Sequence, residues 1–111
     1  MKAYVPKKGD FVAITFDPQS GHEQKGRRPA LVVSNTLFNE QVGLAIVCPL
    51  TTRDRGYPFH IAVTDNPKVT GFVMVEQVKS IDYVTRKAKM MGKASNELLD
   101  EVLSLLDACI Y

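Results

Sequence analysis

The apolar residues of this 111-residue chain fall into short segments separated by breaker residues, and this pattern limits the fold more than any other feature. Residues 11–16 alternate with a period of two, and residues 30–33 form a continuous apolar run typical of a buried strand. Further strand-like segments occupy residues 44–50, 59–63, 71–75, 76–82 and 87–91. Breakers such as Asp17-Pro18 end them, because proline cannot donate to a β-ladder. The sequence therefore predicts a mainly β chain.

Only the C-terminal region has a clear helical pattern. Ser95 is a suitable N-cap, and Glu97 lies near the positive end of the expected helix dipole. Helical spacing relates Leu98, Val102, Leu105, Leu106 and Cys109, and the stripe is widened by Leu99, Leu103 and Ile110. We therefore expect much of this helix to be covered, and residues 36–42 could add one helical turn. These patterns predict a mainly β (α+β) fold, in which residues 1–111 form one domain: a small twisted barrel of about five to seven strands, closed by the terminal helix.

The sequence contains no segment that suggests export or membrane insertion. No apolar run approaches membrane-spanning length, and residues 1–6 lack the apolar core of a secretory signal. We therefore expect a cytoplasmic protein without membrane association. Cys48 lies in an apolar run and Cys109 near the C-terminus, so we predict two buried, reduced thiols and no disulfide.

The basic and acidic side chains are unevenly distributed along the chain. All 14 lysines and arginines precede Ala94 and are accompanied by eight acids, which gives that part a net charge of +6. The remaining 18 residues hold four acids and no base, a net charge of −4. A basic body suggests a polyanionic partner. Chance asymmetry on a solvated surface explains the same numbers equally well.

Several common kinds of active site are missing from the sequence. It has neither a glycine-rich phosphate loop nor a Gly-x-Ser-x-Gly nucleophile elbow. Its acids, histidines and cysteines do not cluster with the spacing of metal ligands, which argues against two-metal phosphoryl chemistry. We therefore expect no metal and no cofactor.

The segment Gly-His-Glu-Gln-Lys-Gly-Arg-Arg-Pro, residues 21–29, is unusually polar for a connection between two strands. Arg28 stands at the entrance to the second strand, and Thr51 stands at the exit of the third. If these two strands pair antiparallel, Arg28 and Thr51 become neighbours, with Glu23 and Gln24 above them. A guanidinium, a hydroxyl and a carboxylate around one point suit a phosphodiester. The cations expected to attract a nucleic-acid backbone are Lys25, Arg27, Arg53 and Arg55.

Simpler interpretations exist for each of these residues. Arg28 could pair with Asp17 or Glu23 at the surface, and Thr51 and Thr52 could be plain β-formers. A structural role suits both histidines, His22 and His60, better than a catalytic one. Base stacking is open to Phe16, Tyr57 and Phe59, although the core is the better place for Phe16 and Phe59.

Beyond these individual residues, the chain resembles the MazF/PemK family of toxin–antitoxin endoribonucleases. The likeness rests on Phe16-Asp17-Pro18 followed by residues 21–34, then on Pro49-Leu50-Thr51-Thr52, Gly56-Tyr57-Pro58-Phe59 and residues 76–82. It covers nearly the whole chain. The resemblance implies an SH3-like, PemK-type barrel, a homodimer, and metal-independent, sequence-specific cleavage of single-stranded RNA, usually mRNA. The RNA 2′-hydroxyl would attack the adjacent phosphate, giving 2′,3′-cyclic phosphate and 5′-hydroxyl ends.

The resemblance also assigns roles to individual residues. The family's catalytic arginine and threonine match Arg28 and Thr51, and its loop acid matches Glu23. Gln77 matches a position that contacts RNA bases. The other residues we expect to bind RNA are Gln24, Lys25, Arg27, Arg53, Arg55, Tyr57 and Lys79. A cognate antitoxin with an acidic, disordered C-terminal segment is expected to wrap the dimer.

Two questions stay open at this point. Arginine has a pKa above about 12 and is a poor base, so Glu23 is the better general base on chemical grounds, although relatives have been interpreted with the arginine as acid or base. The loop Arg53-Asp54-Arg55 and the segment after Asp65 vary in the family and help set the recognised sequence, so no cleavage motif is transferred. The alternatives from other classes are a non-enzymatic toxin that poisons DNA gyrase through a related barrel, and an RNA-binding barrel without activity.

Overall fold

The computed structural model describes residues 4–15 and 27–111. The described strands are β1 (Asp10–Thr15), β2 (Arg27–Val32), β3 (Ala45–Thr51), β4 (His60–Val63), β5 (Gly71–Met74), β6 (Lys79–Ile81) and β7 (Lys89–Lys93). The helices are α1 (Thr36–Val42), α2 (Asn96–Ile110) and the short 3₁₀ turn η2 (Val75–Gln77). The turn predicted at residues 36–42 and the terminal helix are confirmed, as are the predicted strands except the segment 76–82, of which only Lys79–Ile81 is strand.

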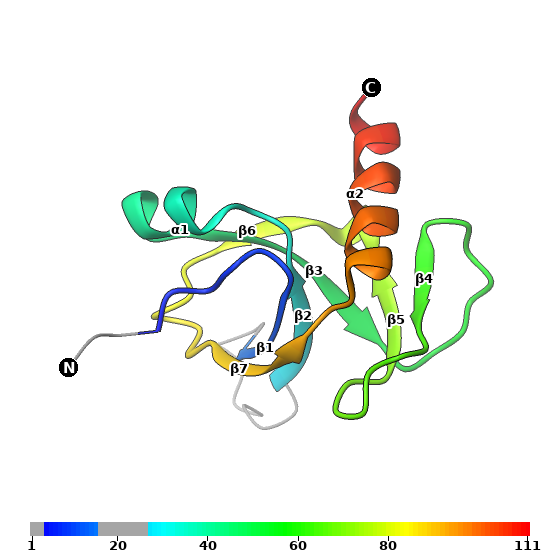
Figure 1. The fold of residues 1–111 in the computed structure, drawn as a ribbon, viewed down its shortest axis with the longest axis horizontal. Coiled ribbons are helices and arrows are strands. Elements are labelled where there is room, and N and C mark those ends of the chain that lie inside the picture. Colours follow the sequence, from blue (N-terminus) through cyan, green and yellow to red (C-terminus); the bar gives the residue numbers. More distant parts are fainter. Residues whose placement is uncertain (1–3, 16–26) are drawn as a thin grey trace.

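All the strand pairs are antiparallel, and the seven strands form one strongly curled sheet (Figure 1). The strand order is β4-β5-β3-β2-β1-β7, and β6 pairs with the first half of β3. No ladder among the described strands joins the two ends of this path, β4 and β7. The predicted barrel is therefore open: the sheet curls into a barrel-like shape, but its edge strands β4 and β7 do not pair with each other.

Alternation along the central strand β3 divides the core into two parts. Cys48 and Leu50 point to the side covered by α2, where they pack in one cluster with Leu98 and Val102. Val47 points to the opposite side, into a second cluster that includes Ala30, Val32 and Tyr83. Successive side chains of a strand point to opposite faces. Both faces of β3 are apolar because each face is covered by one of the two clusters.

The turn η2 interrupts the strand that was predicted to continue through residues 76–82. Leu50 of β3 pairs with Val73, whereas Val47 pairs with Lys79, so three residues of β3 correspond to six residues of the neighbouring chain. The surplus is taken up by η2, which lifts Glu76 and Gln77 out of the ladder. The prediction of uninterrupted alternation was wrong here, because alternation does not encode hydrogen-bond register.

A fully buried asparagine joins α1 to the rest of the molecule. The Asn39 side-chain amide donates to the Pro6 carbonyl at 2.8 Å and the Ser34 carbonyl at 3.3 Å, and it accepts from the Ser34 hydroxyl. The Tyr83 hydroxyl donates to the Asn39 carbonyl at 2.9 Å. These bonds satisfy polar groups that water cannot reach, as buried polar groups require.

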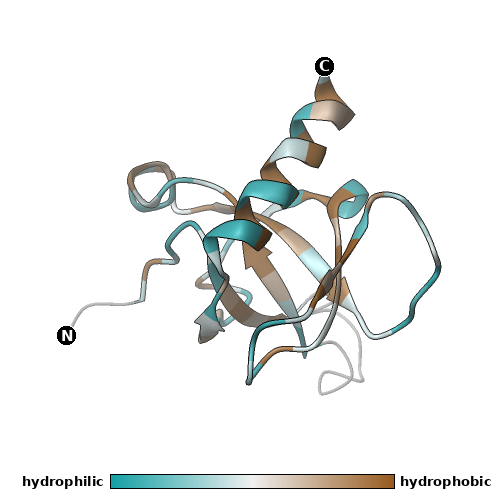
Figure 2. Cartoon of the chain, turned by 45° about the vertical axis from the view of Figure 1, so that its right-hand side comes forward, coloured by the Kyte–Doolittle hydropathy of each residue, from teal (hydrophilic) through white to brown (hydrophobic). Residues whose placement is uncertain are grey.

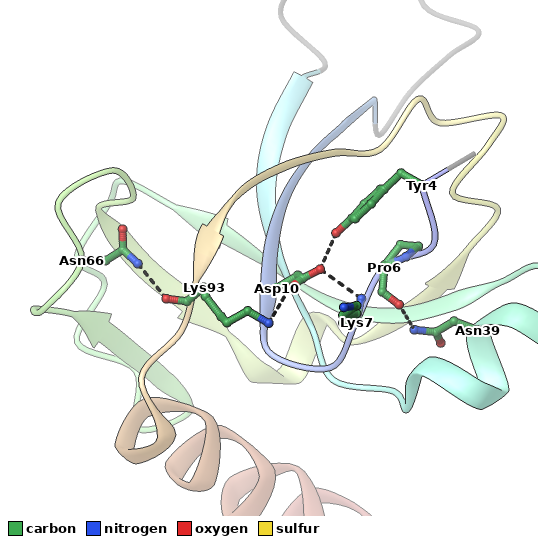
Figure 3. A network of polar contacts seen from close by, with 7 residues as sticks. All are labelled: Tyr4, Pro6, Lys7, Asp10, Asn39, Asn66 and Lys93. Atoms are coloured by element: carbon green, nitrogen blue, oxygen red, sulfur yellow. Dashed lines mark hydrogen bonds and ion pairs between the residues drawn. The ribbon is translucent and has the colours of Figure 1, made fainter. Parts of the chain in front are cut away.

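Asp10, at the start of β1, anchors the N-terminal segment (Figure 3). Its carboxylate accepts from the Tyr4 hydroxyl and from the Lys7 backbone N–H at 3.0 Å, and Lys93 Nζ of β7 lies 3.2 Å away. Burial, followed by the hydrogen bond to Asp10, raises the pKa of Tyr4 well above its ordinary value. The cluster ties three separate parts of the chain together beside β1.

The terminal helix α2 begins as predicted but is less covered than predicted. The Ser95 hydroxyl accepts from the Leu98 backbone N–H at 3.1 Å, as an N-cap should. Only Leu98 and Val102 are buried, and the last turns project beyond the strands (Figure 1), leaving Ile110 67% exposed. Figure 2 shows hydrophobic residues on this projecting end.

The two cysteines differ in their surroundings. Both are free, but Cys48 is buried and Cys109 is exposed, so burial was predicted correctly for only one of them. Burial raises the pKa of Cys48 to about 12, which keeps the thiol protonated at neutral pH. Across residues 4–15 and 27–111, no helix has the length and apolar character needed to cross a membrane.

Candidate active site

The pairing of β2 with β3 brings Arg28 and Thr51 together. Val32 pairs with Val47, and Ala30 pairs with Pro49. Extending this antiparallel register by two residues places Arg28 opposite Thr51. Both residues line a cavity of about 330 Å³, whose described lining residues are Arg27, Arg28, Pro29, Leu50, Thr51, Thr52, Arg53 and Thr70. The sequence-based prediction that the two strand ends meet is confirmed.

The same register places a further cation on this face of the sheet. Arg28 shares its face with Ala30 and Val32, and Lys79 lies directly opposite Val47 on that face. Burial lowers the pKa of Lys79, and the nearby positive charge of Arg86 lowers it further. The surface that begins at the cavity and continues toward β6 is therefore electropositive, as a polyanion site requires.

Thr51 is oriented by the chain on both sides of it. The Arg53 backbone N–H donates to Thr51 Oγ1 at 3.2 Å, and since no described residue accepts the hydroxyl proton, Thr51 can donate it to a ligand. Gly71 begins β5 with φ +116°, and a Cβ on it would lie 2.6 Å from the Thr51 carbonyl oxygen. Only glycine permits this close approach, so Gly71 fixes the end of β3 beside the cavity.

The two adjacent arginines of β2 are used differently. Arg27 Nη1 donates to Thr15 Oγ1 at 3.2 Å and to the backbone carbonyls of Arg86 at 3.3 Å and Lys87 at 2.9 Å. Its guanidinium therefore fastens the end of β1 to the turn before β7. Arg28 pairs with Ile14 through its backbone, and its exposed side chain makes no hydrogen bond or ion pair with any other residue that the structure describes. Of the two guanidinium groups, only that of Arg28 has no partner among the described residues.

The connection between β3 and β4 forms an arm that is mainly hydrophilic (Figure 2), and its first residues, Thr52 and Arg53, line the cavity. Asp54 Oδ1 accepts from the Gly56 backbone N–H at 3.0 Å, and Gly56 has φ +66°. Arg53 and Arg55 are exposed on this arm, and Tyr57 is 49% exposed. The arm carries three of the residues predicted to bind RNA, although only Arg53 reaches the cavity wall.

The other predicted site residues are spread more widely. Gln77 in η2 and Lys79 in β6 are exposed but do not line the cavity. Glu23, Gln24 and Lys25 lie outside the described residues. The same holds for Asp17, so neither of the alternative partners considered for Arg28, Asp17 and Glu23, is described. Sequence reasoning missed Thr70, which lines the cavity because β5 pairs with Thr51. The only available signal was its position before a glycine.

The chemistry open to this cavity follows from its described lining. It offers guanidinium groups and hydroxyls but no carboxylate and no imidazole. In the described part of the chain, no three His, Cys, Asp or Glu side chains lie where they could together hold a metal ion. Such a site can bind a phosphate and stabilise charge that grows on it.

Comparison with known proteins agrees with this geometry. A family model described as "PemK-like, MazF-like toxin of type II toxin-antitoxin system" matches residues 7–110. The chain is 36% identical over 107 residues to the endoribonuclease toxin MazF of Escherichia coli (strain K12), with 96% of each chain covered. It also resembles the crystal structure of MazF from Deinococcus radiodurans, with TM-score 0.87 and 40% identity over 97% of this chain and 98% of that one. A crystal structure of MazE–MazF from the same organism matches with TM-score 0.86 and 34% identity, covering 97% of each chain.

Proposed function

Because the chain belongs to the PemK-like, MazF-like toxins of type II toxin–antitoxin systems and is an endoribonuclease of that family, we propose that it cleaves single-stranded RNA at the Arg28–Thr51 cavity. The observation that carries this proposal is the register that sets Arg28 opposite Thr51. The Arg28 side chain bonds to no other described residue and can bind phosphate oxygens through two parallel N–H donors. The Thr51 hydroxyl has its proton available for a third oxygen.

The proposed reaction is transphosphorylation without a metal. The RNA 2′-oxygen attacks the adjacent phosphorus and loses its proton, the bond from phosphorus to the 5′-oxygen breaks, and the 5′-oxygen takes up a proton. The products are a 2′,3′-cyclic phosphate and a 5′-hydroxyl. Arg28 neutralises the negative charge that accumulates on the phosphorane, which is the largest single contribution expected from this site. Glu23 is the proposed proton acceptor, since the described lining supplies no other base.

RNA binding extends beyond the cavity along both neighbouring elements. We assign the RNA on either side of the scissile phosphate to described residues of two regions. These are Arg53, Arg55 and Tyr57 on the arm, and Gln77 of η2 and Lys79 of β6. Exposed cations bind the backbone, and Tyr57 and Gln77 are suited to stacking on and hydrogen bonding with bases. Gln24 and Lys25 complete the assigned contacts, and Arg27 contributes positive charge alone.

The proposal includes the partners of the toxin. A toxin of this family is paired with a cognate antitoxin, and the MazF of Deinococcus radiodurans has a structure with MazE. We assign an acidic, disordered segment to the antitoxin, because it would compete with RNA for the basic surface. We also assign a homodimer, supported by the incompletely covered apolar stripe of α2, whose Ile110 is 67% exposed. The proposed place of action is the cytoplasm.

The test uses RNA with a single 2′-deoxy substitution. The cleavage sites are first mapped on a long RNA in EDTA, and a short oligonucleotide with one site is then made with and without the 2′-hydroxyl at that position. We expect the natural oligonucleotide to be cut and the substituted one to survive. Arg28→Ala and Thr51→Ala should each lower kcat by about 100-fold or more while leaving the melting temperature unchanged.

Three results would contradict the proposal. Cleavage of the 2′-deoxy oligonucleotide would exclude the 2′-oxygen as nucleophile, and parental rates in both variants would exclude the Arg28–Thr51 centre. A parent that cuts no RNA would leave a non-enzymatic toxin or a binding barrel as the better assignment.

A further inference from the structure

A buried histidine lies between the two elements assigned to base recognition. His60 begins β4, and its side chain is only 3% exposed. Its Nε2 lies 2.8 Å from Oε2 of Glu76, the second residue of η2. The imidazole also packs against the Tyr57 ring, with centroids 4.9 Å apart and planes inclined by 54°. One side chain thus contacts both the arm between β3 and β4 and the turn η2.

Backbone hydrogen bonds reinforce this crossing point. The His60 N–H donates to the Tyr57 carbonyl at 3.1 Å, and the Val75 N–H donates to the Phe59 carbonyl at 3.1 Å. Glu76 is exposed and directly precedes Gln77, so a bond that holds the Glu76 side chain also limits the orientation of its neighbour. The His60–Glu76 pair therefore connects Tyr57 to Gln77 through two contacts.

Packing alone does not account for an imidazole at this position. His60 Nδ1 is buried and has no hydrogen-bond partner among residues 4–15 and 27–111. An unsatisfied buried nitrogen is unfavourable, and an apolar side chain of similar size would fill the space without that cost. What the imidazole supplies, and an apolar residue cannot, is the Nε2–H that donates to the Glu76 carboxylate.

We infer that His60 is a positioning residue for RNA sequence recognition, holding Tyr57 and Gln77 in one fixed relation through its contacts with Tyr57 and Glu76. The inference rests on the proposed function but concerns the choice of bases, not bond cleavage. The Arg28–Thr51 cavity is lined by none of these four residues, so its chemistry should be unaffected when the pair is broken. Loosening either contact should let Tyr57 and Gln77 move independently and accept further bases.

Three substitutions separate this role from a structural one. His60→Leu keeps the bulk and removes the donor. His60→Gln keeps a side-chain N–H that can replace Nε2, and Glu76→Gln keeps an acceptor without the charge. The control is Glu40→Gln, which removes one acid from the exposed surface of α1. Each variant is assayed for its cleavage sites on a long RNA, for KM and kcat on the best oligonucleotide, and for thermal melting.

We expect His60→Leu to raise KM about tenfold, to leave kcat within about twofold, and to cut at sites that differ from the parental site by one base. His60→Gln should restore most of the parental KM and site profile, Glu76→Gln should lie between them, and Glu40→Gln should match the parent. A merely structural role would lower the melting temperature without changing the sites cut below it. The inference is overturned if folded His60→Leu keeps the parental sites and KM, or if kcat falls instead.

A second measurement keeps the inference separate from the proposed function. Binding of 2′-deoxy oligonucleotides that differ in one base is followed by fluorescence anisotropy. If the parent binds RNA without cutting it, the proposed function fails. The role of His60 is then tested only by comparing the base preference of binding in the parent and in His60→Leu. Parental preference in His60→Leu, or a parent that binds no oligonucleotide, overturns the inference.

Discussion

The Asn39 cluster and the Arg28–Thr51 cavity are both built from polar residues next to strand ends, but they use these residues in opposite ways. Around Asn39, which is fully buried, the side-chain amide and hydroxyl groups bond to one another and to backbone groups. Around Arg28 and Thr51 the polar groups face a cavity, and the Arg28 side chain makes no bond to another described residue. A polar group already bonded within the chain stabilises the fold, whereas one left unbonded at an accessible surface can bind a ligand.

The sharpest way to test this comparison is to remove the buried asparagine. We expect Asn39→Ala to lower the free energy of unfolding by about 4 kcal/mol, because it leaves several buried groups without partners and opens a cavity. Urea unfolding measures this loss. RNA cleavage per folded molecule, at a temperature where the variant stays folded, should be unchanged.

Asn35→Ala is the matched control for this prediction. Asn35 is exposed at the N-cap position of α1, but its side chain makes no capping hydrogen bond. Its substitution should change the unfolding free energy by less than about 0.5 kcal/mol. Equal losses in both variants would show that the buried bonds around Asn39 are not the source of its effect.

A smaller effect is expected at Gly71, which contacts the end of β3 beside the cavity. Gly71→Ala should cost about 3 kcal/mol of stability, because the residue has φ +116° and its new Cβ would lie 2.6 Å from the Thr51 carbonyl oxygen. Displacing Thr51 should also lower kcat, so this variant alone should lose both properties. Gly43→Ala is the control, since Gly43 has φ +78° but nothing within 4 Å of the added Cβ. If the two variants behave alike, backbone conformation alone explains the glycine.

Much of the fold and of the candidate site could be predicted from local sequence patterns. Period-two alternation located the strands, and Ser95 was correctly predicted as the N-cap of α2. The meeting of Arg28 and Thr51 needed one further assumption, antiparallel pairing, which neighbouring strands commonly adopt. Each of these features is encoded by a few neighbouring residues, or follows from the pairing of one strand with the next.

The features that could not be predicted depend on long-range contacts. The interruption at η2 follows from the register of β5 and β6 on β3, which alternation does not specify. The apolar spacing of α2 predicted its buried face but not that Cys109 and Ile110 project beyond the sheet. The His60–Glu76 pair joins residues 16 positions apart, and neither residue stands out in the sequence.

The smallest expected effect distinguishes the two adjacent arginines, whose different use cannot be read from the sequence because Arg27 bonds to carbonyls about 60 residues away. Arg27→Met keeps the aliphatic bulk but removes the side-chain hydrogen bonds to Thr15, Arg86 and Lys87. It should lower the free energy of unfolding by about 1 kcal/mol, because water can take over hydrogen bonding to these partly exposed groups. Its kcat should stay parental, and RNA affinity should fall about threefold at low salt and less at high salt, because only charge is lost. Urea unfolding and oligonucleotide binding at two salt concentrations provide the measurement. If Arg27→Met instead abolishes cleavage while Arg28→Met retains it, the assignment of the two arginines must be exchanged.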